Sequence, residues 1–66
     1  MRIVLVAMYD GKQYEIDDQL ELVVKKVNDA RGTGKLVNLT IYKIPTGQQI
    51  AIDPERVQTI IARDNR

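Results

Sequence analysis

Apolar residues dominate both faces of the first stretch of the chain. In an extended conformation, Ile3, Leu5, Ala7 and Tyr9 would lie on one side, and Val4, Val6 and Met8 on the other. The run ends at Asp10-Gly11, a dipeptide typical of tight hairpin turns. Polar and apolar residues then alternate over residues 13–16, as in a returning strand with one solvated face. The pattern predicts a β-hairpin with strands near residues 2–9 and 13–16.

The spacing of apolar residues changes after residue 17. Apolar side chains recur at intervals of three and four, on Leu20, Val23, Val24, Val27 and Ala30. This spacing is one face of an amphipathic helix. Asp17 or Asp18 is expected at the N-cap, and Gly32 just past the last turn. A strand is the alternative because the segment is rich in valine, but the caps and the period agree on a helix near 18–30.

A second hairpin is expected in the C-terminal half. Apolar and polar residues alternate over 36–44, Pro45-Thr46-Gly47 is typical of a tight turn, and 48–52 provides the return strand. The pattern therefore predicts a hairpin–helix–hairpin order.

The last segment fits two structures. Asp53-Pro54 is typical of a helix start, whereas Val57, Thr59 and Ile61 alternate as in a strand. A tight turn followed by a fifth strand is favoured by the many β-branched residues, and a short helix is the alternative. The chain thus predicts one α+β domain over residues 1–66, a small two-layer ββαββ arrangement with a short C-terminal strand or helix.

The absence of two residue types limits how so short a chain is stabilised. Sixty-six residues are near the lower limit for a domain that folds without a disulfide, a metal or a partner. The sequence contains no Cys, which excludes disulfides and zinc–thiolate sites. It also contains no His, the commonest transition-metal ligand. We therefore expect no metal and no cofactor, and we expect association, most simply a homodimer.

The same absences argue against catalysis. Without Ser, Cys or His, the usual nucleophile–base pairs cannot form. The segment Gly32-Thr33-Gly34-Lys35 is not a phosphate loop, because it runs from the predicted helix to a strand, the reverse of that motif. We expect a small binding or regulatory protein rather than an enzyme.

Excess apolar surface indicates where a partner would bind. A two-layer domain covers one face of its sheet, yet the strand at 2–9 is apolar on both. Leu22 also lies about 200° around the helix from Leu20, away from the apolar stripe. The candidate self-association residues are Val4, Val6, Met8 and Leu22. The partners expected are a second copy and another protein.

A local excess of positive charge gives the alternative function. Its candidate residues are Lys25, Lys26, Arg31, Lys35 and Lys43. Such a cluster is typical of a patch that contacts phosphates of nucleic acid. The formal net charge of only +1 favours protein contacts instead.

The N-terminal apolar run is too short to span a membrane, and it ends at Asp10-Gly11 without a cleavage pattern. We therefore expect a cytoplasmic protein that does not enter the membrane.

Overall fold

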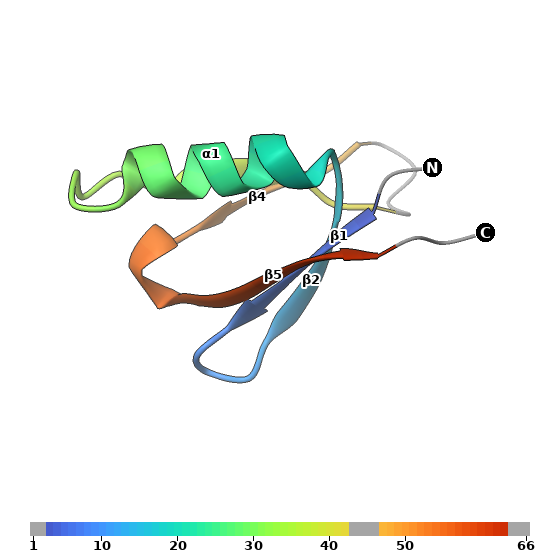
Figure 1. Ribbon diagram of the computed structural model, residues 1–66, viewed down its shortest axis with the longest axis horizontal. Coiled ribbons are helices and arrows are strands. Elements are labelled where there is room, and N and C mark those ends of the chain that lie inside the picture. Colours follow the sequence, from blue (N-terminus) through green and yellow to red (C-terminus); the bar gives the residue numbers. More distant parts are fainter. Residues whose placement is uncertain (1–2, 43–46, 64–66) are drawn as a thin grey trace.

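The computed structural model describes residues 3–42 and 47–63. In chain order, the elements are β1 (Ile3–Met8), β2 (Gln13–Asp17), α1 (Leu20–Ala30), β3 (Val37–Thr40), β4 (Gln49–Ile52), the 3-10 turn η1 (Pro54–Arg56) and β5 (Val57–Arg63). The predicted α+β class and the ββαββ order are confirmed (Figure 1). The expected turn at 45–47 lies mostly outside the described residues. In the last segment, the tight turn and the fifth strand both form.

The first hairpin forms where Asp10-Gly11 interrupts the apolar run. Gly11 has a φ of +92°, a conformation that favours glycine. The Lys12 N–H donates to Asp10 Oδ1 at 3.0 Å, which fixes the turn. On its other edge β1 pairs antiparallel with β5, so the strand order of this sheet is β2-β1-β5.

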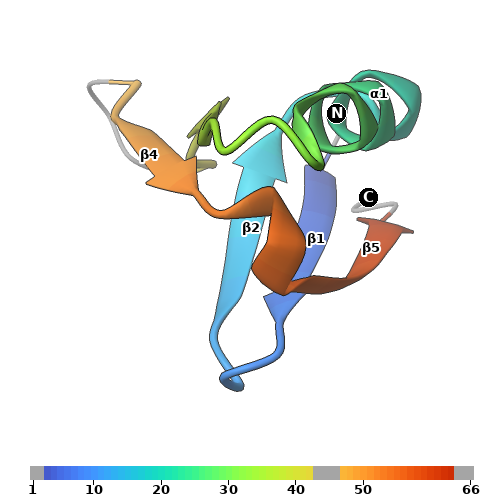
Figure 2. The same cartoon turned by 90° about the vertical axis from the view of Figure 1, so that its left-hand side faces the viewer.

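The second sheet, β3 and β4, joins the first at one point. Ile41 forms an isolated antiparallel bridge with Ile16 of β2. The Tyr42 N–H also donates to the Glu15 carbonyl at 2.9 Å. The two sheets therefore meet along the edge of β2 that is not paired with β1. Figure 2 shows the second sheet to one side of β2, with α1 above β1 and β5.

The core lies between α1 and the two sheets. Its buried side chains come from every strand and from α1: Val4, Val6, Met8, Ile16, Val23, Val27, Val37, Leu39, Ile52 and Val57. Val6, Ile16 and Val23 have no exposed surface. The helix contributes Val23 and Val27, four residues apart, as the apolar spacing predicts.

The prediction that Val4, Val6 and Met8 form a free second face of β1 is wrong. Their exposed fractions are 1%, 0% and 8%. The physical reason is the covering of this side by α1, which places it at the centre of the core. The side of β1 that points away from the core carries Leu5 instead, and it is only half-buried.

The start of α1 lies one or two residues later than expected. Gln19 occupies the N-cap position and makes no side-chain capping bond. Asp18 lies just before it, and its Oδ1 accepts a hydrogen bond from the Gln19 N–H at 2.8 Å. The prediction of Asp17 or Asp18 as the N-cap is therefore wrong. The carboxylate of Asp18 instead fixes the chain that enters the helix.

The end of α1 is connected to η1 and β5 by side-chain hydrogen bonds. Arg31 donates from Nε to the Pro54 carbonyl at 3.3 Å and from Nη2 to the Val57 carbonyl at 3.4 Å. The Gly32 N–H donates to Glu55 Oε2 at 2.7 Å. These bonds join segments more than 20 residues apart in the chain, so they fix the C-terminal end of the helix relative to β5.

Two leucines three residues apart test the position of the core. Leu39 is 1% exposed and Leu36 is 59% exposed. Replacing Leu39 with Ala should lower the free energy of unfolding by about 3–5 kcal/mol, because a cavity remains in the core. The matched Leu36→Ala change should alter it by less than about 0.5 kcal/mol. Urea unfolding measures both, and equal losses would contradict the described core.

Candidate functional site

The structure separates the cations expected to form one basic patch. Lys25 Nζ lies 3.0 Å from Asp29 Oδ2, and Lys26 Nζ lies 3.4 Å from Asp18 Oδ2. Arg31 uses its guanidinium on the main-chain carbonyls of η1 and β5. Lys43 lies outside the described residues. Of the five candidates, only Lys35 is both described and without an ion-pair or side-chain hydrogen-bond partner within residues 3–42 and 47–63.

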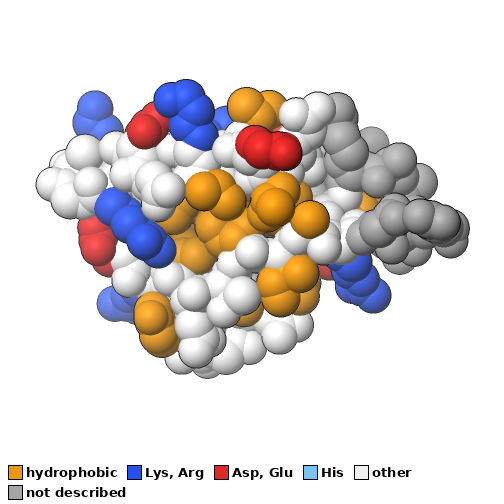
Figure 3. Space-filling view, in the orientation of Figure 1, with side chains coloured by type: hydrophobic (Ala, Val, Ile, Leu, Met, Phe, Trp, Pro, Cys, Tyr) orange, Lys and Arg blue, Asp and Glu red, His pale blue; other side chains and the backbone are white. Residues whose placement is uncertain are grey.

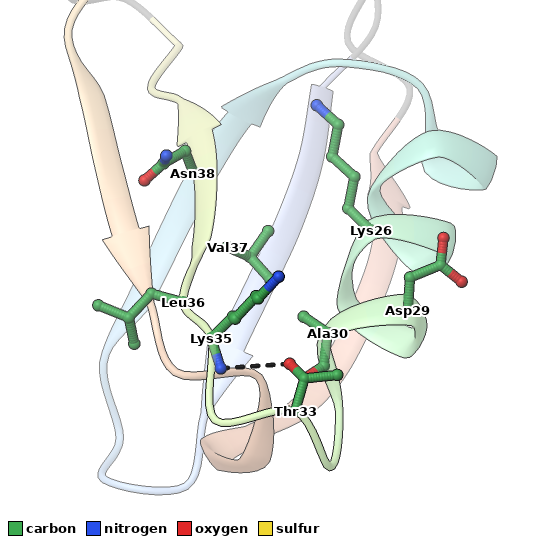
Figure 4. A pocket seen from close by; sticks show the side chains of 8 residues that line it. All are labelled: Lys26, Asp29, Ala30, Thr33, Lys35, Leu36, Val37 and Asn38. Atoms are coloured by element: carbon green, nitrogen blue, oxygen red, sulfur yellow. Dashed lines mark hydrogen bonds between the residues drawn. The ribbon is translucent and has the colours of Figure 1, made fainter.

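Lys26 and Lys35 nevertheless both line a groove between α1 and the start of β3. Its volume is about 380 Å³. Residues from α1, the following loop and β3 line it: Lys26, Asp29, Ala30, Thr33, Lys35, Leu36, Val37 and Asn38. Figure 4 shows Lys26 on the helix and Lys35 on the loop, with Val37 beside Lys35 and with the Lys26 ammonium extended away from Lys35, in keeping with its hydrogen bond to Asp18. We call this the α1–β3 groove.

The loop that closes one end of the α1–β3 groove is held by Thr33. Its hydroxyl donates to the Ala30 carbonyl at 2.5 Å and accepts the Lys35 N–H at 3.2 Å (Figure 4). Gly32 and Gly34 on either side have φ of +78° and +76°, conformations that favour glycine. The glycine-rich loop is therefore a connector that positions Lys35 beside the helix.

The outer face of the three-stranded sheet carries a second surface. Leu5 lies opposite Glu15 of β2 and Ile61 of β5, and directly opposed residues share a face. An ion pair crosses this face, with Arg63 Nη1 2.6 Å from Glu15 Oε2. Ile61 remains 48% exposed. The surface available on β1 and β5 is therefore the Leu5–Ile61 row.

The free edge of β5 adjoins this row. Within residues 3–42 and 47–63, β5 pairs as a strand with β1 alone, so beyond Val57, whose carbonyl accepts from Arg31, its other edge carries unpaired main-chain groups. Residues 57–62 contain no charged side chain and no proline. Native edge strands are usually protected by such residues. We call this the β5 edge.

The flank of α1 nearest the β5 edge is apolar. Lys26, Asp29 and Ala30 line the groove on the β3 side of the helix. At about 100° per residue, Leu20 and Val24 lie on the opposite flank, toward β5. Both are half-buried. Figure 3 shows hydrophobic side chains gathered between α1 and β5, so an added strand would meet apolar surface there.

The four predicted self-association residues are not brought together. Val4, Val6 and Met8 are in the core, whereas Leu22 is on the surface of α1 and is 45% exposed. Sequence reasoning missed Leu5 and Ile61, which carry the outward apolar surface. The alternation of apolar residues could have indicated Leu5, because it belongs to the other apolar side of the same strand, opposite to Val4 and Val6.

The described part of the chain shows no group of three or more His, Cys, Asp or Glu arranged to hold a metal. It also contains no helix long and apolar enough to cross a bilayer. Comparisons with models of protein families, with curated proteins and with solved structures find no match to this chain. Functional inference therefore depends on the surfaces described above.

Arg31 can be used to test which basic residues stabilise the fold and which remain free to contact a partner. Arg31→Gln should lower the free energy of unfolding by about 1–2 kcal/mol, because two charged hydrogen bonds to carbonyls are lost. Lys25→Gln is the control, and it should change stability by less than about 0.5 kcal/mol because its ion pair is exposed. Thermal and urea unfolding measure the difference. An unchanged stability in Arg31→Gln would show that this side chain is free for other roles.

Proposed function

We propose that this is a non-catalytic binding protein that acts through protein–protein contacts, and that its β5 edge binds a second copy of the chain. The observation that carries the proposal is an edge strand, β5, whose residues 57–62 contain neither a charged side chain nor a proline, the usual protection of such strands. The absence of Ser, Cys and His supports a role without catalysis.

The three other strands with an open edge differ from β5, and β3 is only four residues long. β4 is only four residues long and is followed by Asp53-Pro54, and proline cannot donate to a ladder. β2 is met along part of its second edge by Ile41 and Tyr42. β5 therefore offers the longest run of unpaired main-chain groups in the described part of the chain, beside the apolar flank of α1.

A second copy suits the β5 edge because the strand is compatible with itself. Two identical strands related by a two-fold axis pair antiparallel, and the residues nearest the axis meet their symmetry-related equivalents. Since residues 57–62 are uncharged, the central part of such a pair brings no like charges together. The pairing would also join the Leu5–Ile61 rows of both copies. A short chain without disulfides gains most from this kind of support.

The alternative, a nucleic-acid-binding module, has one observation in its favour. Lys26 and Lys35 converge on the α1–β3 groove. The other described candidate cations are held by Asp29 or by main-chain carbonyls. A duplex-binding surface commonly needs many phosphate contacts, so we rank this function second.

Ile61 and Leu22 form a matched pair for testing the dimer, because their exposed fractions are 48% and 45%. We expect the wild-type protein to sediment as a dimer. Ile61→Lys should yield a folded monomer, since it adds a charge of the same sign to each of the two paired strands. Leu22→Lys should remain dimeric.

Sedimentation measures mass, and circular dichroism checks that both variants are folded. A wild-type monomer at high micromolar concentration, with stability unaffected by dilution, would refute the dimer. If Leu22→Lys were monomeric and Ile61→Lys remained dimeric, the dimer interface would lie on α1 and not at the β5 edge.

Salt dependence separates the two function classes. We expect no measurable binding to duplex DNA or RNA at physiological salt. A true DNA binder loses about 0.9 log unit of affinity per phosphate contact for each log unit of salt. Micromolar affinity that falls with salt, and that falls further when Lys26 and Lys35 are replaced by Gln, would favour the alternative over protein binding.

A further inference from the structure

The main chain of the second sheet shows which edge of β3 is unpaired. The Ile41 N–H donates to the Gln48 carbonyl, toward β4, at 2.9 Å. The next amide, on Tyr42, donates to the Glu15 carbonyl, toward β2. Neighbouring residues of an extended strand thus point their main-chain groups to opposite edges.

The same alternation applies along β3. Val37 and Leu39, like Ile41, point their main-chain groups toward β4, in register with Ile52 and Ile50. The main-chain groups of Asn38 point away from β4. This is the edge that β2 meets further along, at Ile41 and Tyr42. In Figure 4, β3 lies between β4 and α1, so the part of this edge at Asn38 that β2 does not pair lies on the side of the α1–β3 groove.

The groove combines an apolar floor with a positive rim. Val37 is 5% exposed and Ala30 is half-buried. Lys35 has no ion-pair partner within residues 3–42 and 47–63, and Lys26 Nζ is held only at 3.4 Å by Asp18. The carboxylate of Asp29 is already engaged by Lys25 on the outside of the helix. Lys26 and Lys35 outnumber Asp29 among the charged residues that line the groove, so the net formal charge of its lining is positive.

We propose that the α1–β3 groove binds a short extended segment of another protein that carries acidic side chains. The segment would add as a strand to the free edge of β3 through the N–H and carbonyl of Asn38. Its apolar side chains would contact Val37 and Ala30, and its carboxylates would meet Lys26 and Lys35. Strand addition supplies affinity through the main chain, and the flanking side chains supply specificity.

The dimensions suit a few residues of extended chain. A volume of about 380 Å³ lies at the small end of the range of ligand pockets, about 300–1,000 Å³. Two lysines match one or two carboxylates, whereas a nucleic acid strand would need a longer positive track. This site is separate from the β5 edge, so the two proposals succeed or fail independently.

The test uses a fluorescein-labelled peptide of alternating glutamate and valine, titrated with the full chain at low and physiological salt. Fluorescence anisotropy should show saturable binding. In ¹H–¹⁵N spectra, the Asn38 amide and the amides of residues 35–37 should shift. A peptide with lysine in place of glutamate should not bind.

Charge reversal localises the contact. Lys35→Glu should weaken binding by about tenfold, since an attraction becomes a repulsion. Lys12→Glu makes the same charge change in the β1–β2 connection and should leave the affinity unchanged. The Ile61→Lys variant should bind the acidic peptide with unchanged affinity, because the α1–β3 groove is separate from the β5 edge.

Three results would overturn the proposal. They are no shift at Asn38 on binding, equal weakening by Lys12→Glu and Lys35→Glu, or binding of a single-stranded oligonucleotide that is tighter than that of the acidic peptide.

Discussion

The packing of α1 against the first sheet is the interaction on which the rest of the structure depends. Val23 and Val27 lie on Val4, Val6 and Ile16, and all five side chains are at most 1% exposed. In the described part of the chain, the main-chain link between the two sheets is the Ile16–Ile41 bridge with the hydrogen bond from the Tyr42 N–H to the Glu15 carbonyl. Without the helix, few contacts would hold the second sheet over the core. Burying this contact removes apolar surface from water, and the hydrogen bonds of Arg31 then fix the helix end.

Periodicity together with turn residues predicted the ββαββ order, although the last segment fitted either a strand or a helix. The period of two over residues 3–8 and the period near 3.6 over residues 20–30 each correspond to an observed element. The face of β1 that is buried could not be read in the same way. Both sets of alternating residues are apolar, so local pattern gives no preference. The choice depends on where α1 and the second sheet close over the strand, which is a long-range property.

The candidate sites were predictable only in part for a related reason. Lys25, Lys26, Arg31 and Lys35 are close in sequence, but a helix distributes successive residues by about 100° around its axis. Lys25 therefore meets Asp29 one turn later, whereas Lys26 faces β3. Arg31 follows the last helical residue and reaches the carbonyls of η1 and β5 instead of solvent. These basic residues are close in the sequence, which indicated one cluster of positive charge. The helix directs their side chains to different sides, so they do not form one patch.

One helix of 11 residues leaves main-chain edges uncovered on both of its sides. β5 is open along one flank and the start of β3 along the other, so a single packing choice creates two places for strand addition. Main-chain hydrogen bonds are similar at both edges, and the side chains around them must therefore determine the partner. Residues 57–62 of the β5 edge are uncharged, which suits an identical strand. The β3 edge is bordered by Lys26 and Lys35, so a second β5 gains nothing from its charges, whereas an acidic segment does.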